Sequence, residues 1–390
     1  MSAIVNADVV IIGGGLVGAS AAFHLRRFQG MSVILLERGY IGSQASGVNF
    51  GNVRRQGRYL PQLPLAHRAR DIWGALPELL GEDCEFVPTG HLKVAYTGEE
   101  MHELEVYAHD ARAYGLELTI MSGAEIRRLH SYIGADVVGG SYAPVDGHAN
   151  PRLAAPAFAR AARREGAFVY EQSAVLKVEW DAGGFRIEAA DGRVFHAGVL
   201  INAAGAWGAR IACQFGEEVP LTPRGPHMAV TETLPYFIKP VLGTSDHKIY
   251  MRQVLRGSIV FGGGAHVPVD LDSPFPRPKT SQLLRQWADM TRLIPALRKI
   301  QVLRTWSGVE GYLPDGLPVI GPSGKIPGLI HAFGLCGHGF QIAPAVGAVI
   351  AEIAHHGESR TPIDYSTVER FHSAAGRNLT QDAFVSSVLS

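Results

Sequence analysis

Cysteine is scarce in this chain. Its 390 residues include only Cys84, Cys213 and Cys336, which are widely spaced and form no CxxC pair. This usage argues against a disulfide scaffold, a structural zinc site and iron–sulfur ligation. We therefore expect no metal site.

An excess of charge of one sign is also lacking, because 36 lysines and arginines balance 36 aspartates and glutamates. The chain has no basic field that would attract nucleic acid, and no polybasic or amphipathic stretch typical of a membrane surface. No run of about 20 apolar residues is free of charge and glycine, which argues against a spanning helix. The first residues also lack the basic start and the cleavage site of a signal peptide. We therefore expect a cytoplasmic protein.

Glycine, in contrast, is abundant, and a glycine motif follows the first apolar run, residues 8–12. The motif has the form Gly-x-Gly-x-x-Gly, opens an Ala-rich helix, and consists of Gly13, Gly15 and Gly18. The first glycine permits a tight turn, the second lets a pyrophosphate approach the backbone, and the third lets helix and strand pack closely. Glu37 ends a second apolar run, residues 33–36, and is spaced to accept hydrogen bonds from ribose hydroxyls. The pattern predicts a dinucleotide site at a helix N-terminus.

Periodicity and turn residues predict a mixed α/β chain beyond this unit. Helices are expected over 62–80, 98–114, 122–130 with Ser122 as the N-cap, 152–165, 280–298 and 341–356. Strands are expected over 86–95, in a meander from 174 to 205, in a hairpin of 248–253 and 258–262, and over 328–333. The polar segment 42–58 is too long for a simple connection, and such loops are usually functional.

Two later segments favour a flavin over a nicotinamide cofactor. In residues 199–207 a buried strand runs into Ala-Ala-Gly, which suits close approach to a cofactor. Residues 328–341 combine a strand, a loop of small residues and the start of a helix. The exposed amides of that loop and the helix N-terminus can neutralise negative charge on a reduced flavin.

The order and spacing of these motifs resemble those of the FAD-dependent amine oxidoreductases, which include D-amino-acid oxidase, glycine oxidase and sarcosine oxidase. The matching pieces are the first glycine motif with Glu37, then residues 42–47, 202–207, 314–321 and 337–340. The resemblance implies an α/β (α+β composite) fold with a Rossmann-like FAD-binding domain and an inserted mixed-sheet substrate domain. We expect the FAD-binding domain to comprise 1–85, 140–218 and 302–390, and the substrate domain 86–139 and 219–301.

By resemblance, the FAD is bound non-covalently, because Gly308 stands near the place where some members carry an attachment cysteine. The ADP half would be held by Gly13, Gly15, Gly18 and Glu37, and the pyrophosphate and flavin edge by Ser43, Gln44, Ala45, Ser46 and Gly47. The adenine would meet Val175, and the ribityl and isoalloxazine would meet Ala204, Gly205, Gly337, His338, Gly339, Phe340 and Gln341. Arg38 and Trp207 complete the expected cofactor set.

The resemblance further implies that a hydride equivalent passes from the α-carbon of an amino acid to flavin N5, and that water hydrolyses the resulting imine. A dedicated protein base is not required if the amine binds in its neutral form. The candidate catalytic groups are His338, Tyr250 and Glu310. Glu310 stands where glycine-oxidase-like members have an arginine, and it would attract a substrate ammonium or pair with a structural arginine.

A substrate carboxylate requires a cation, and the candidates are Arg54, Arg55, Arg58 and Arg252. A solvated basic loop or a contact with flavin phosphate would explain the first three equally well. Gln341 replaces the lysine of sarcosine-oxidase-like members and joins the substrate-binding set. Several arginines suggest a secondary amine with two carboxylates, such as an opine or iminodiacetate.

Other functions share these motifs. The chain could oxidise a 2-hydroxy acid, or serve as the flavin subunit of a larger complex and pass electrons to a partner. The electron acceptor, O2 or another molecule, and the choice between a partner subunit and a homo-oligomer are left open by the sequence.

Overall fold

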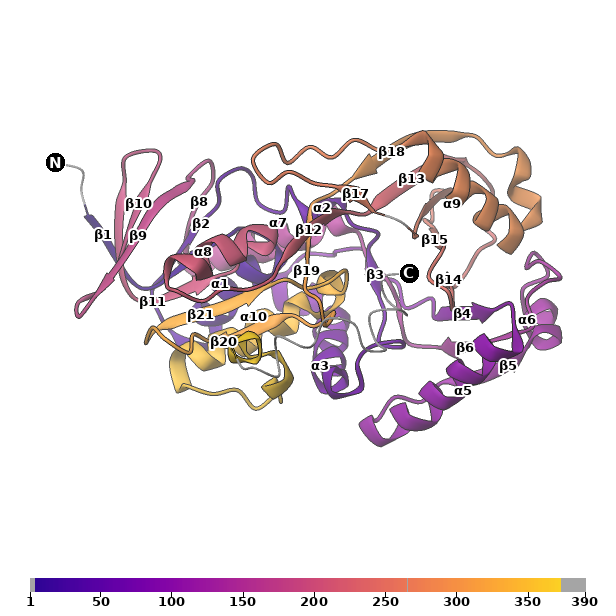
Figure 1. Cartoon of the computed structure of the whole chain (residues 1–390), viewed down its shortest axis with the longest axis horizontal. Coiled ribbons are helices and arrows are strands. Elements are labelled where there is room, and N and C mark those ends of the chain that lie inside the picture. Colours follow the sequence, from indigo (N-terminus) through magenta and orange to yellow (C-terminus); the bar gives the residue numbers. More distant parts are fainter. Residues whose placement is uncertain (1–3, 265, 373–390) are drawn as a thin grey trace.

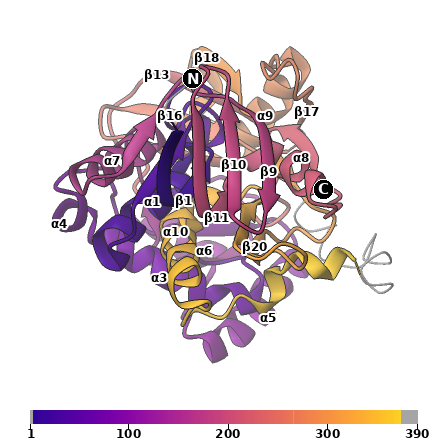
Figure 2. The ribbon, with the colours of Figure 1, turned by 90° about the vertical axis from the view of Figure 1, so that its left-hand side faces the viewer.

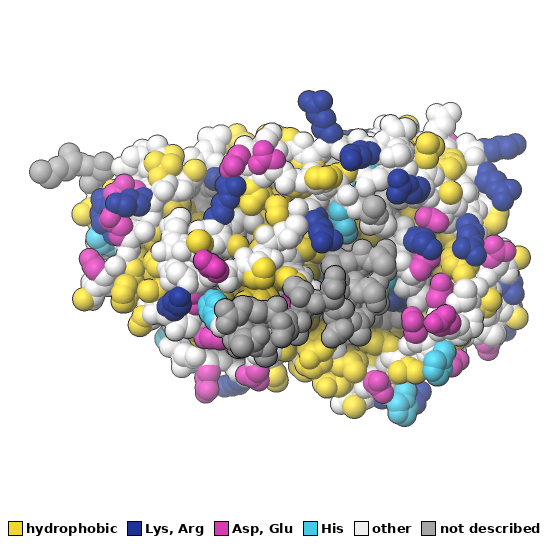
Figure 3. All heavy atoms as spheres, viewed as in Figure 1, with side chains coloured by type: hydrophobic (Ala, Val, Ile, Leu, Met, Phe, Trp, Pro, Cys, Tyr) yellow, Lys and Arg dark blue, Asp and Glu magenta, His cyan; other side chains and the backbone are white. Residues whose placement is uncertain are grey.

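The computed structural model describes residues 4–264 and 266–372, which form two eight-stranded sheets and the helices that cover them (Figure 1). The first sheet lies on the left of Figure 1 and the second on the right. On the face shown in Figure 3, basic and acidic side chains occur together at both ends, as the balanced composition suggests. Within the described residues, no helix has the length and apolar character needed to cross a membrane.

The first sheet has five parallel strands, an antiparallel edge strand and two further antiparallel strands that pair beside one of the five. Its order is β20 (Val319–Pro322), β21 (Leu329–Phe333), β11 (Val194–Asn202), β1 (Ile4–Ile12), β2 (Val33–Leu36) and β8 (Phe168–Tyr170). The register aligns Val10 with Ile34 on one side and Leu200 on the other. The apolar runs of β1 and β2 form this sheet because both of its faces are covered.

Four helices cover one face of the first sheet. They are α1 (Leu16–Gln29), α3 (Leu63–Gly74), α7 (Pro151–Arg164) and α10 (Gly339–His356). The opposite face packs against α8 (Gly208–Gln214) and the predicted meander, in which β9 (Val175–Asp181) and β10 (Gly184–Ala189) precede β11. Figure 2 shows the three meander strands side by side. This layering brings the carboxyl ends of β1, β11 and β21 to one edge of the sheet.

The second sheet is mixed and has its own apolar core. Its order is β18 (Val302–Ser307), β13 (His227–Thr233), β16 (Ser258–Gly262), β15 (Tyr250–Gln253), β14 (Val241–Thr244), β4 (His91–Ala95), β6 (Gly139–Ala143) and β5 (Thr119–Ser122). The predicted hairpin is confirmed as β15 and β16. The helices α5 (Gly98–Ala111), α6 (Gly123–Leu129) and α9 (Thr280–Leu293) pack beside it. Ser122 caps α6 as predicted, because its side chain accepts the Glu125 amide.

Short elements join the two sheets. They are α2 (Ala45–Val48), β3 (Asn52–Val53), α4 (Leu76–Leu80), β7 (Gly147–His148), β12 (Thr222–Gly225), β17 (Val267–Pro268) and β19 (Glu310–Tyr312). The division into two domains stays a prediction. Strands β6 and β18 pair within the second sheet, although the predicted boundaries assign 140–218 and 302–390 to the first.

Candidate active site

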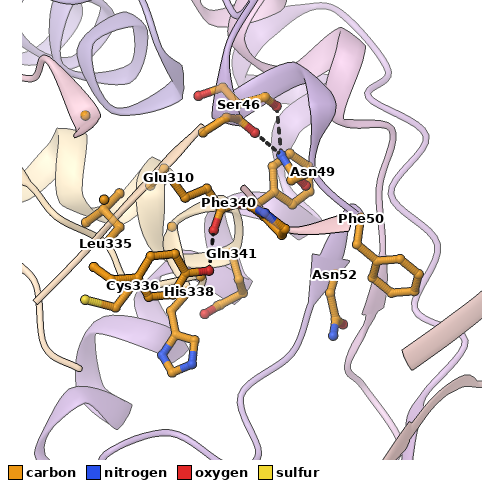
Figure 4. Close-up of a pocket in the computed structure, with 18 of the residues that line it drawn as sticks. Ser46, Asn49, Phe50, Asn52, Glu310, Leu335, Cys336, His338, Phe340 and Gln341 are labelled. Atoms are coloured by element: carbon orange, nitrogen blue, oxygen red, sulfur yellow. Dashed lines mark hydrogen bonds between the residues drawn. The ribbon is translucent and has the colours of Figure 1, made fainter. Parts of the chain in front are cut away.

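A cavity of about 260 Å³ lies where the two sheets meet. Residues that follow β1, β11 and β21 form one wall, and residues of the second sheet, β19 and the loop 42–58 form the rest. The carboxyl ends of parallel strands are the usual place for a ligand in such sheets. Figure 4 shows part of the lining.

The glycine turn after β1 has the shape that its motif predicts. Gly13 has a φ of +112°, and a Cβ there would lie 2.4 Å from the carbonyl oxygen of Ala203. A Cβ on Gly18 would lie 2.0 Å from the carbonyl oxygen of Gly13. Gly15 is the N-cap of α1 and, as a glycine, contributes no side-chain cap. The positive end of α1 therefore faces the cavity, which Gly15 and Leu16 line.

The polar loop after β2 is fastened to this turn. Gly42 donates its amide to the Gly14 carbonyl at 2.9 Å, and the Ser46 hydroxyl accepts the Leu16 amide at 2.8 Å. Asn49 donates its side-chain amide to the carbonyls of two α2 residues, one of them Ser46 (Figure 4). Ala45 and Ser46 line the cavity, whereas the other predicted members of this segment, Ser43, Gln44 and Gly47, flank it.

Glu37 accepts two backbone hydrogen bonds, from Gly14 at 2.7 Å and Gly39 at 2.8 Å. Its carbonyl accepts the Ser173 amide, which brings the segment before Val175 alongside. The Arg38 guanidinium lies 3.6 Å from the centre of the Trp207 ring. Besides Ser43, Gln44 and Gly47, the residues of the predicted cofactor set that do not line this cavity are Gly13, Gly18, Glu37, Arg38, Val175, Ala204 and Trp207. Gly205 does line it.

The start of α10 forms the opposite part of the wall, from Gly337 to Gln341. His338 is the N-cap of this helix, with no side-chain cap, and its imidazole points away from Ser46 and Asn49 in Figure 4. Gln341 is buried and donates its side-chain amide to the Ala66 carbonyl at 2.8 Å.

Three buried polar atoms on the cavity wall have no partner among the described residues. They are the side-chain oxygens of Asn52 and Gln341 and Nε2 of His227. Buried polar groups in native proteins are almost always hydrogen-bonded. The two oxygens fit a polar ligand with hydrogen-bond donors, and the N-termini of α1 and α10 fit a negatively charged part of it.

Arg54 and Arg58 line the cavity without a carboxylate partner among the described residues. Arg58 is only 2% exposed and donates to the carbonyls of Arg54 at 3.1 Å and His338 at 3.4 Å. Arg54 donates to the Gln56 carbonyl. Burial and the charge of Arg54 lower the pKa of Arg58 to about 9, so both side chains remain cationic at neutral pH.

The prediction that Arg55 and Arg252 bind substrate is not supported by their positions, because neither lines the cavity. Arg55 forms an ion pair with the fully buried Asp146 carboxylate at 2.8 Å. Arg252 donates to the Phe50 carbonyl at 2.8 Å and contacts Nδ1 of His148 at 3.1 Å. Both arginines hold the loop 42–58 and its surroundings in place instead.

Glu310 belongs to a hydrogen-bonded chain on the cavity wall. The Tyr312 hydroxyl donates to Glu310 at 3.0 Å and lies 3.1 Å from Nε2 of His266. Burial raises the pKa of Glu310, although the hydrogen bond from Tyr312 works against it. Tyr250 also lines the cavity, and its hydroxyl contacts only the sulfur of Met228, at 3.7 Å.

His338 cannot act as a cationic acid at neutral pH. Burial, followed by the charges of Arg58 and Arg54, holds its pKa well below the usual range, so its imidazole is neutral. Its predicted catalytic role is therefore limited to that of a neutral donor or acceptor.

Several lining residues are outside the predicted set. They include Asn49, Asn52, Tyr312, Cys336, His227, His247 and His266. Tyr312 was detectable, because it follows Glu310 by two residues on one strand and so shares its face. The others come from segments far apart in the chain, and no local pattern connects them.

A family model described as FAD dependent oxidoreductase matches residues 8–353. The chain belongs to this family, which confirms FAD as its cofactor and oxidoreductase as its enzyme class. The starts of α1 and α10 and the unpartnered polar atoms of the cavity fit this cofactor. Burial raises the pKa of Cys336 to about 12, so the one cysteine on the cavity wall is a neutral thiol.

Several individual proteins are similar to this chain over most of its length. Glycine oxidase of Geobacillus kaustophilus is 28% identical over 361 residues, which cover 90% of this chain and 94% of that protein. Mitochondrial sarcosine dehydrogenase of Homo sapiens is 27% identical over 385 residues, which cover 94% of this chain but 42% of that protein. The solved structure of L-proline dehydrogenase from P. horikoshii has a TM-score of 0.89 at 26% identity and covers 95% of this chain and 99% of that one. The predicted fold class is thereby confirmed.

Proposed function

We propose that this chain oxidises the C–N bond of an N-substituted or D-configured amino acid. The observation that carries the proposal is the pair of arginines, Arg54 and Arg58, that face the cavity without a carboxylate partner in the described part of the chain. A guanidinium in such a setting is the preferred partner of a carboxylate. The names of the relatives, glycine oxidase, sarcosine dehydrogenase and L-proline dehydrogenase, support an amino acid as the substrate.

The cofactor is proposed to follow the wall from α1 to α10. The amide of Gly15 and the hydroxyl of Ser46, which accepts the Leu16 amide and can still donate, would hold the pyrophosphate, and the start of α10 would lie against the isoalloxazine. Glu37 accepts backbone amides at the turn, and its remaining lone pairs are available to the ribose. Bound FAD supplies the acceptor for a hydride equivalent from the substrate α-carbon.

On the substrate side, Arg54 and Arg58 orient the carboxylate, and Glu310 receives the ammonium. A carboxyl group whose pKa is raised by burial is a better proton acceptor, so Glu310 takes up the proton that the ammonium loses before oxidation. The proton moves from the substrate nitrogen to a Glu310 oxygen, and Tyr312 holds that carboxylate in place. Water then hydrolyses the imine product.

Substitution of the arginines tests this function. In Arg54→Met and Arg58→Met the KM for the amino acid is expected to rise about 10- to 100-fold, because a hydrogen bond to a charged group is worth about 1.5–3 kcal/mol. Arg152→Met is a control, because this exposed arginine on α7 lies outside the cavity. A KM unchanged in both cavity variants, with FAD content intact, would contradict the proposal.

The electron acceptor requires a separate measurement. Substrate-reduced enzyme that forms hydrogen peroxide in air is an oxidase. Enzyme that reoxidises only with an artificial dye is a dehydrogenase that passes electrons to another molecule or a partner protein.

A further inference from the structure

A second cavity of about 130 Å³ adjoins the first. The two share Arg58 and His247 in their linings. The rest of its lining comes from the loop 42–58, from α5 and from the second sheet, which contributes Lys93 on β4. No predicted function accounts for this lysine or for its cavity.

The cationic ends of Arg54 and Lys93 converge beside Gly57. This glycine has a φ of +72°, a left-handed conformation that favours glycine. A Cβ there would lie 3.2 Å from Nη1 of Arg54 and 3.6 Å from Nζ of Lys93. A residue with a side chain would therefore occupy the space at which the two positive charges meet.

The nearby carboxylates act on these charges only from a distance, because each is paired elsewhere or lies at the rim. Asp146 pairs with Arg55, and Asp246 pairs with Lys248 at 2.8 Å. Glu103 lines the second cavity from its exposed rim, and Glu100 accepts the amide of Tyr96. Within residues 4–264 and 266–372, no carboxylate lies within 4.0 Å of Arg54, Arg58 or Lys93.

The imidazoles around this group add no charge. Burial and the neighbouring cations hold the pKa values of His91, His247 and His338 well below the usual range. Burial and Arg54 also lower the pKa of Lys93 to about 8. The charges of Arg54 and Lys93 have the same sign and repel each other strongly in a poorly solvated site. An anion bound between the two side chains would offset this repulsion.

We propose that Lys93 and His247 form a second anion site, beside the one at Arg54 and Arg58, and that it binds a second carboxylate of the substrate. Nζ of Lys93 lies 3.4 Å from Nε2 of His247, which leaves the other ammonium hydrogens free to donate. The hydroxyls of Tyr107 and Ser245 are on the same wall. The proposal rests on the proposed function and narrows its substrate to an amino acid with two acidic groups.

Binding of substrate-like acids to the oxidised FAD enzyme tests the site without turnover. Malonate, succinate, glutarate and acetate would be titrated by calorimetry and by the change in flavin absorbance. At least one dicarboxylate is expected to bind 10- to 100-fold more tightly than acetate, which is the range of a charged hydrogen bond. In Lys93→Met this advantage should disappear, while the affinity for acetate stays within about twofold.

Two further variants make the result specific. Lys239→Met removes an exposed lysine that lines neither cavity and should leave both affinities unchanged. Lys93→Arg keeps the charge and should restore most of the dicarboxylate affinity in a protein with normal FAD content. This pair also separates loss of the site from misfolding of Lys93→Met.

Several outcomes would overturn the proposal. One is equal affinity for acetate and for all dicarboxylates in the unaltered enzyme, and another is an unchanged dicarboxylate advantage in Lys93→Met. A third is that inorganic phosphate binds at Lys93 while acetate is bound, and that no dicarboxylate binds more tightly than acetate. The Lys93 site would then bind a separate anion and not a second carboxylate of the substrate. Failure of the proposed function would give another result. Arg54→Met would then leave the affinity for acetate unchanged, while Lys93→Met would still abolish the tighter binding of dicarboxylates.

Discussion

The two ends of the main cavity are built in opposite ways. The end near α1 is formed mainly by backbone groups. Gly13 and Gly18 leave no room for side chains, and the Glu37 carboxylate accepts two backbone amides. At the other end, long side chains from separate elements converge, and within the described residues Arg54 and Arg58 have no carboxylate partner. One end therefore offers a ligand mainly backbone groups, whereas the other has side-chain charges that a ligand must balance.

The difference separates what a family shares from what an individual enzyme selects. A backbone cradle fits the constant phosphate and ribose groups of a dinucleotide, so it tolerates little change. Side chains such as Arg54, Glu310 and Lys93 can be exchanged without altering the fold, and substrate choice lies in such exchanges.

The largest effect is expected at the backbone end. In Gly18→Ala the added methyl would lie 2.0 Å from the Gly13 carbonyl oxygen. The backbone itself must shift to relieve this clash, because neither a methyl group nor a carbonyl has another rotamer to adopt. Such overpacking costs about 1–3 kcal/mol and distorts the turn itself, so we expect loss of bound FAD. Flavin absorbance of the purified protein measures this. Gly198→Ala on β11 is the matched control, since nothing lies within 4 Å of a Cβ there, and it should retain FAD. If Gly18→Ala retained FAD, the turn would be able to move enough to accommodate the added methyl group.

The same contrast explains what the sequence could predict. The glycine turn and the start of α10 are each encoded by contiguous residues, so the sequence spacing predicts them. Arg54 and Arg55 are neighbours, and from the sequence either could bind a substrate carboxylate. Only the fold shows that Arg55 pairs with Asp146, which lies 91 residues further along the chain. Lys93 and His247 meet through the parallel pairing of β4 with β14, which no local pattern reveals.

Neighbouring arginines should have opposite effects on stability. Arg55→Met leaves the fully buried Asp146 carboxylate unpaired, which costs about 3–5 kcal/mol. Arg54→Met removes a partly buried cation from a positive cluster, so the free energy of unfolding should stay the same or rise. Denaturant unfolding of the two variants, monitored by circular dichroism, makes the comparison. Equal destabilisation would mean that Arg54 has a structural role.

Glu310 gives the substrate end a pH signature. Because burial raises its pKa above 4.5, the folded chain holds a proton there that the unfolded chain has released. Stability therefore falls as the pH rises from about 4.5 through the pKa of the folded state. In Glu310→Gln this contribution is absent, so its melting temperature should decline less between acidic and neutral pH. Parallel curves for the two proteins would mean that the pKa of Glu310 is the same in the folded and the unfolded chain.

The smallest effect should come from Tyr250, and it sharpens the assignment of roles on one wall. Its hydroxyl meets only the Met228 sulfur, a weak acceptor, so Tyr250→Phe should keep kcat/KM within about twofold. Tyr312→Phe removes the donor to Glu310 and the contact with His266, and a net hydrogen bond of about 1 kcal/mol predicts a several-fold loss. Both substitutions delete one oxygen from the same cavity, so cavity size is controlled. A larger loss in Tyr250→Phe would move the catalytic contact from β19 to β15, and the role assigned to Glu310 would then lose its supporting tyrosine.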